Sequence, residues 1–145
     1  MRDTILFGDC RQTLKQLDEK ARMCVTSPPY YGMRDYGGEN KQIGLEQSPQ
    51  EYINQLVEVF REVRNCLTDD GTLWLNIGDS YYNYRPGKGQ SLVKQTVANS
   101  KQDLPDKCAR RGNKLDGLKE KDLIGIPWML AFALRADGMV LKARY

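Results

Sequence analysis

The stretch Arg22-Met23-Cys24-Val25-Thr26-Ser27-Pro28-Pro29-Tyr30-Tyr31-Gly32 contains the strongest indication of the fold of this chain. Residues 22–25 are predicted to form a short apolar strand. This strand stops at the two prolines, because proline supplies no N–H to a β-ladder. The residues that follow therefore lie in a loop at the carboxyl end of a strand. In open α/β sheets, ligands and reactive residues gather at that end.

Predicted strands and helices alternate on both sides of this stretch. Residues 4–7 are predicted as a first strand, and Asp9 as the N-cap of the helix that follows it. Residues 48–51 form a strong helix start, with Ser as N-cap, Pro at the first helical position and Glu completing a capping box. Apolar residues then recur at three- and four-residue spacing up to Leu67, so one face of this helix is expected to pack on a sheet. We expect the turn Asp69-Asp70-Gly71 to end it.

Three more elements complete the pattern. Residues 72–77 form a nearly continuous apolar strand, which is typical of a parallel sheet covered by helices on both faces. Residues 126–135 are predicted as a helix that stops near Gly138, and residues 139–141 as the start of another strand. Asp79 follows the strand at 72–77; we expect it to line the cleft, with a helix cap as the alternative. The alternation predicts an α/β sheet of the doubly wound kind.

The composition excludes several classes of protein. A chain of 145 residues has the size of one domain, and 40% hydrophobic with 28% charged residues is typical of a globular protein. The chain contains no histidine, which excludes Ser-His-Asp catalysis, and its four cysteines form no zinc-ligand pair, so we expect no metal. No apolar run approaches the roughly 20 residues of a membrane-spanning helix, and the first residues lack a signal-peptide pattern. We therefore expect a cytoplasmic protein.

Positive charge is concentrated in one part of the chain. Between Arg85 and Lys121 there are ten Lys or Arg residues against four Asp or Glu, whereas the remainder carries a net negative charge. This part belongs to a segment at about 81–121 without convincing periodicity, which we interpret as an irregular basic insertion. The charge indicates a polyanionic partner such as nucleic acid, and a solvated basic loop is the alternative.

The loop Thr26–Gly32 has the groups needed to hold a nucleobase. The Ser27 hydroxyl and the carbonyl oxygens of Pro28 and Pro29 can accept hydrogen bonds from an exocyclic amino group. The Tyr30 ring offers a flat surface for the plane of a base, as extruded bases are generally held. This arrangement favours an amino nitrogen whose lone pair is free to react.

With these residues the sequence resembles the DNA methylases that modify the N4 of cytosine or the N6 of adenine, whose catalytic motif is [S/D/N]-P-P-[Y/F/W]. Five further segments look like family segments in family order: 8–9, 31–37, 43–46, 71–80 and 121–128. The resemblance implies a Rossmann-like, S-adenosylmethionine-dependent methyltransferase fold in the permuted order of the beta-type members. The family's cofactor motif Phe-x-Gly-x-Gly is absent, and in that order it would follow Tyr145. We therefore expect residues 1–145 to be an incomplete, N-terminal part of the catalytic domain.

The resemblance and the charge pattern together predict three groups of site residues. Ser27, Pro28, Pro29 and Tyr30 are expected to be catalytic. Asp9, Thr26 and Ser27 are expected to border S-adenosylmethionine, although the N-cap alone would explain Asp9. Double-stranded DNA is expected to contact six residues: Tyr31, Arg34, Tyr36, Arg110, Arg111 and Lys114.

The residue before the two prolines indicates the target base. Serine there is more often associated with cytosine N4 methylation, and adenine N6 remains the alternative. A hypothesis of another class is a truncated, non-catalytic fragment that binds DNA or a partner chain. We expect the isolated chain to be inactive because it lacks the cofactor motif, and a second polypeptide that carries the missing half is an open alternative.

Overall fold

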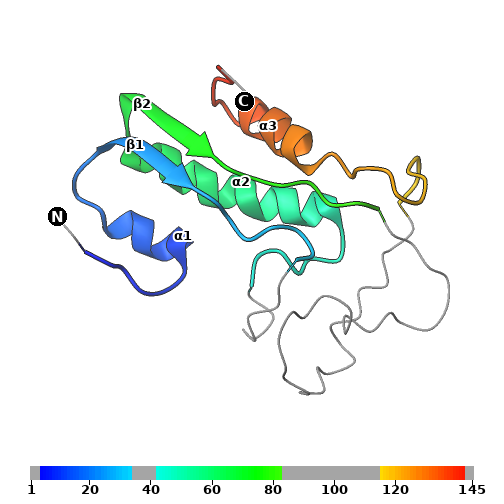
Figure 1. Ribbon diagram of the computed structural model, residues 1–145. Helices are drawn as coiled ribbons and strands as arrows, with labels where there is room; N and C mark the ends of the chain where they lie inside the picture. Colours follow the sequence, from blue (N-terminus) through cyan, green and yellow to red (C-terminus); the bar gives the residue numbers. More distant parts are fainter. Residues whose placement is uncertain (1–3, 34–41, 83–114, 143–145) are drawn as a thin grey trace.

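The computed structural model describes residues 4–33, 42–82 and 115–142, which form a mixed α/β arrangement (Figure 1). Two helices and two strands make up its centre, preceded by a short helical segment. In chain order the elements are α1 (Cys10–Thr13), the 3₁₀ helix η1 (Leu14–Gln16), β1 (Ala21–Thr26), α2 (Pro49–Cys66), β2 (Leu67–Leu75) and α3 (Ile126–Ala136).

The predicted start of α2 is confirmed. The Ser48 side chain accepts a hydrogen bond from the backbone of Glu51 at 3.2 Å, and the Glu51 carboxylate accepts one from the backbone of Gln47 at 3.1 Å. The helix buries an apolar stripe, and the apolar side of α3 completes the same core. The members of this core are Tyr52, Ile53, Leu56, Phe60, Val63, Ile126, Leu130 and Leu134.

The strands β1 and β2 are parallel and directly hydrogen-bonded. Val25 lies opposite Trp74 and Thr26 opposite Leu75. Near the start of β2 the register is irregular, and there the predicted turn at 69–71 falls inside the strand instead of in a separate loop. A Cβ atom on Gly71 would lie 2.8 Å from the Thr68 carbonyl oxygen, so this bend requires glycine.

The described helices lie on one face of the strand pair, with α2 in the middle, η1 on one side and α3 on the other (Figure 1). Cys24, Leu73 and Leu75 point into this core. On the opposite face Val25 is 70% exposed and Trp74 52% exposed. The expectation of helices on both faces is therefore wrong for the described residues. The apolar residues of β2 are covered on one face of the strand pair only.

Two predicted strands are absent from the described residues. Residues 4–7 and 139–141 are apolar but form no strand, and Phe7 is 89% exposed. A strand exists only where a neighbour supplies hydrogen-bond partners, and no described strand lies beside either segment. The predicted helix end near Gly138 is confirmed: this residue has φ +99°, and the Met139 N–H bonds the Leu134 carbonyl at 3.0 Å.

The two ends of the predicted insertion at about 81–121 meet each other. Tyr81 forms an antiparallel bridge with Leu123, and the Ile124 N–H donates to the Ser80 carbonyl at 2.9 Å. Residues 83–114 lie outside the described ranges. Among the helices that are described, none is both long enough and apolar enough to cross a membrane.

Candidate active site

The loop that follows β1 and the segment that follows β2 lie side by side, because parallel strands end at the same edge of a sheet. The Asn76 N–H donates to the carbonyl of Thr26, the last residue of β1, at 2.9 Å and continues the ladder one residue past β2. Farther along, the Ser80 hydroxyl donates to the Tyr31 carbonyl at 2.8 Å. The motif Ser27–Tyr30 thus stands at the carboxyl edge of the strand pair, as the sequence predicts.

The motif presents two hydroxyl groups together. Ser27 is exposed, and its Oγ lies 3.4 Å from the Oη of half-buried Tyr30, which is a long and weak contact for two hydroxyls. The Tyr30 ring lies on the backbone of Gly78, where an added Cβ would come within 3.1 Å of the ring. Gly78 therefore lets the ring approach the segment after β2 closely.

The two proline carbonyls have different surroundings. The Pro29 carbonyl accepts a hydrogen bond from the Tyr52 hydroxyl at 2.8 Å and is therefore engaged from the core side. No hydrogen bond to the Pro28 carbonyl occurs among the described residues. A carbonyl oxygen has two lone pairs, so the Pro29 carbonyl can still accept a second hydrogen bond, and the role of both carbonyls toward a ligand stays a prediction.

Tyr52 is a site residue that the sequence analysis missed, because its position fits the apolar stripe of α2. Burial raises the pKa of its phenol, Glu46 and Tyr30 raise it further, and a hydrogen bond from the backbone of Tyr31 acts in the opposite direction. The Tyr31 ring packs against the Tyr52 ring, with centroids 5.4 Å apart. Tyr31 is thus half-buried, and its contact with DNA stays a prediction.

Asp79 caps a helix, which is the alternative that the sequence analysis names for it. Its carboxylate accepts hydrogen bonds from the backbone N–H groups of Ser80, Gly125 and Ile126 at 2.8–3.0 Å. The last two groups belong to the start of α3, where Gly125 has no side chain to serve as its own cap. Asp79 therefore links the end of the β2 segment to α3, and a position on the cleft wall stays a prediction.

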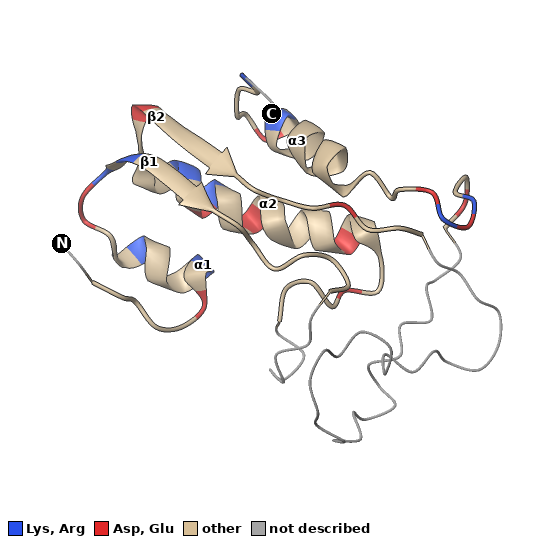
Figure 2. Cartoon of the chain, viewed as in Figure 1, with Lys and Arg blue, Asp and Glu red and all other residues tan. Residues whose placement is uncertain are grey.

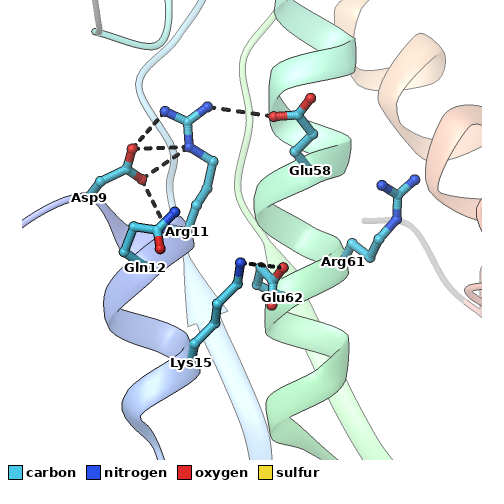
Figure 3. A pocket seen from close by; sticks show the side chains of 7 residues that line it. All are labelled: Asp9, Arg11, Gln12, Lys15, Glu58, Arg61 and Glu62. Atoms are coloured by element: carbon cyan, nitrogen blue, oxygen red, sulfur yellow. Dashed lines mark hydrogen bonds and ion pairs between the residues drawn. The ribbon is translucent and has the colours of Figure 1, made fainter.

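Asp9 caps α1 as predicted, since its side chain accepts a hydrogen bond from the Arg11 backbone at 2.9 Å. Its carboxylate also pairs with the Arg11 guanidinium at 2.7 Å, which raises the pKa of that arginine. Both side chains line an open cavity of about 410 Å³. Figure 3 shows them between α1 and α2. Lys15 and Glu62 form a second ion pair there, at 3.5 Å, so the charges of this cavity are largely compensated.

The remaining predicted residues cannot be placed in the site. Five of the six expected DNA contacts lie outside the described residues: Arg34, Tyr36, Arg110, Arg111 and Lys114. In the part that is described, charged residues are distributed over the helices and both strands, while the motif loop at 26–32 carries none (Figure 2). The same residues contain no group of three or more Cys, Asp or Glu placed to hold a metal ion.

Comparison with known proteins agrees with the motif. A family model described as DNA methylase matches residues 21–129. The chain is 46% identical to the Type II methyltransferase M.Cfr9I of Citrobacter freundii over 97% of its length, and 47% identical to the Type II methyltransferase M.SmaI of Serratia marcescens over 95%. It covers 44% of the length of each of these relatives. No solved structure matches the chain.

Proposed function

Since this chain belongs to the DNA methylase family, we propose that it supplies the base-holding part of a DNA methyltransferase that acts on an exocyclic amino group. The observation that carries the proposal is the position of exposed Ser27 beside Tyr30 at the carboxyl edge of two parallel strands, next to a Pro28 carbonyl with no described partner. We propose cytosine N4 as the acceptor and adenine N6 as the alternative.

The motif residues act on the amino group and on the base. The Ser27 hydroxyl oxygen and the Pro28 carbonyl each accept one amino hydrogen, which draws the nitrogen away from conjugation with the ring and frees its lone pair. The Tyr30 ring covers the plane of the base. The residues therefore hold the nitrogen in the position and hybridisation needed for direct attack on a methyl group.

S-adenosylmethionine would supply that methyl group on a sulfonium. The described residues fit only part of a site for it: Thr26 and Ser27 stand at the strand edge, whereas the Asp9 carboxylate is already bound by Arg11. We propose that the glycine-rich wall of the cofactor site, in the permuted order of the beta-type members, comes from outside these residues. That wall belongs either to the same polypeptide or to a second one.

The remaining assignments are proposals about the surroundings of the site. We assign contacts with double-stranded DNA to Tyr31, Arg34 and Tyr36 beside the motif. The basic residues Arg110, Arg111 and Lys114 are assigned to phosphate contacts, which position a duplex without reading its sequence. We assign the protein to the cytoplasm, where the DNA is.

The proposed function is tested in a chimera in which this chain replaces the matched segment of M.SmaI. We expect the chimera to methylate the DNA that M.SmaI methylates, and Ser27→Ala or Tyr30→Ala to lower the rate about 100- to 1,000-fold, as loss of one preorganised polar group does elsewhere. Mass spectrometry of the nucleosides identifies N4-methylcytosine or N6-methyladenine.

Cys10→Ala and Cys108→Ala are the matched controls, because direct methyl transfer to nitrogen needs no thiol nucleophile. Loss of activity in either control would point to covalent chemistry. Near-normal turnover in Ser27→Ala would contradict the amino-group mechanism. A chimera that binds DNA but transfers no methyl group would favour the alternative, in which this segment only binds.

A further inference from the structure

One buried hydroxyl group bonds the backbone of the motif on both sides of Tyr30. The Tyr52 side chain is fully buried, with 0% exposure, and its Oη donates to the Pro29 carbonyl at 2.8 Å. The backbone of Tyr31 forms a hydrogen bond to the same hydroxyl. The peptide groups before and after Tyr30 are therefore both attached to one atom of α2.

The helix that carries this hydroxyl is a rigid support. Ile53 and Leu56, which follow Tyr52 in α2, are 1% exposed and belong to the same core. Because the phenol is buried and its pKa is raised, it keeps its proton and stays a donor throughout the neutral range. The Tyr31 ring packs against the Tyr52 ring and is tilted 44° to it.

We propose that Tyr52 is a positioning residue of the methyl-transfer site: it fixes the backbone of residues 29–31 so that the Tyr30 ring and the Pro28 carbonyl meet the base in one arrangement. This inference rests on the proposed function. In this role Tyr52 binds neither base nor cofactor; it acts by holding the Pro29 carbonyl in place, which orients the neighbouring Pro28 carbonyl that accepts the amino hydrogen. Sites of this kind lose rate when a supporting hydrogen bond is removed, because the reacting groups lose their preorganised geometry.

The first experiment examines the hydrogen bond in this chain itself. The sequence contains one Pro-Tyr step, Pro29–Tyr30, so a sample with carbonyl-¹³C proline and amide-¹⁵N tyrosine gives a single resonance for that peptide group. We expect Tyr52→Phe, which keeps the buried ring, to shift this resonance. The matched control is Tyr82→Phe, because Tyr82 is 5% exposed and its hydroxyl instead accepts a bond from the Leu115 N–H at 3.1 Å.

The second experiment measures methyl transfer in the M.SmaI chimera at a temperature where all variants are folded. We expect Tyr52→Phe to lower kcat about three- to tenfold with unchanged KM for DNA, which corresponds to about 0.7–1.4 kcal/mol for one hydrogen bond. In a Ser27→Ala background the same substitution should have a smaller effect, because both residues act through one motif. If Tyr52 only stabilised the fold, Tyr52→Phe would lower kcat by the same factor with and without the Ser27→Ala substitution.

The two experiments separate failure of this inference from failure of the proposed function. An unshifted Pro29 resonance in Tyr52→Phe overturns the inference. A shifted resonance with normal kcat, or with equal factors in both backgrounds, also overturns it and leaves the proposed function intact. If the unsubstituted chimera transfers no methyl group, the proposed function and the inference that rests on it both fail. A shift together with the kcat loss supports both.

Discussion

At the scale of single residues, the Tyr30 ring has room only because residue 78 has no side chain. An added Cβ would lie 3.1 and 3.3 Å from two ring atoms, closer than ordinary van der Waals contact. We expect Gly78→Ala to lower the free energy of unfolding by about 1 kcal/mol through this overpacking. Urea unfolding measures it, and in a Tyr30→Ala background the cost should vanish. An equal cost in both backgrounds would mean that the backbone at 78, not the ring, requires glycine.

The same scale shows what the sequence could reveal of the site. Ser27, Pro28, Pro29 and Tyr30 could be proposed as site residues from the sequence because their chemistry is local to one tetrapeptide. Tyr52 was missed because its partner lies 23 residues away, and its spacing in α2 is that of any core residue. Which of the two adjacent carbonyls already has a partner within the fold depends on that distant hydroxyl, so the sequence alone could not assign it.

At the scale of elements, local signals predicted α2 well and isolated strands poorly. The capping residues at 48–51 act within one turn, so their effect is readable from sequence. The apolar runs at 4–7 and 139–141 were predicted as strands from composition. They form none in the described residues, because strand formation depends on a hydrogen-bonding neighbour that the run itself does not specify.

The cap of α3 comes from a residue about 46 positions earlier in the chain. Asp79 satisfies backbone N–H groups of Gly125 and Ile126, and so attaches α3 to the segment beside the motif. We expect Asp79→Ala to lower the free energy of unfolding by about 1–2 kcal/mol, as loss of an N-cap does. The control is Asp69→Ala, which removes an exposed carboxylate from β2.

Urea unfolding measures the stability of both variants, and amide exchange at Gly125 and Ile126 reports the cap itself. Faster exchange at these two amides in Asp79→Ala alone is the expected result. Equal stability of Asp79→Ala and the unsubstituted chain would show that the start of α3 is held by its packing in the core and not by this carboxylate.

At the scale of the whole molecule, the described residues form one sheet layer and one helix layer. A parallel sheet is normally covered on both faces, yet Val25 and Trp74 are paired across the strands and exposed on the same face. The nearly continuous apolar run at 72–77 predicted burial on both faces, which the described residues do not show. The sequence could not show that the described helices all lie on one face, because periodicity states which side of a helix is apolar and not which face of a sheet it covers.

This arrangement determines what the isolated chain can bind. Of the residues proposed to border S-adenosylmethionine, Asp9 is paired with Arg11, and only Thr26 and Ser27 stand at the carboxyl edge of the strand pair. The chain spans 44% of the length of M.Cfr9I and M.SmaI, and it contains no Phe-x-Gly-x-Gly segment, in which glycines let the backbone approach the ligand. Too little cofactor surface would be buried to offset the loss of its translational and rotational freedom.

We therefore expect residues 1–145 alone to bind S-adenosylmethionine with a Kd well above the micromolar range and to transfer no methyl group to DNA. Calorimetric titration of the purified chain measures the affinity, and the M.SmaI chimera, titrated in the same buffer, shows the heat of a complete site. Because binding to a folded site is required, amide exchange must first show that α2 is protected in the isolated chain. Micromolar binding by that folded chain would contradict the expectation. It would mean either that residues 1–145 themselves build the cofactor wall or that two copies of the chain complete one site. In the second case the affinity would depend on the concentration of the chain, and in the first it would not.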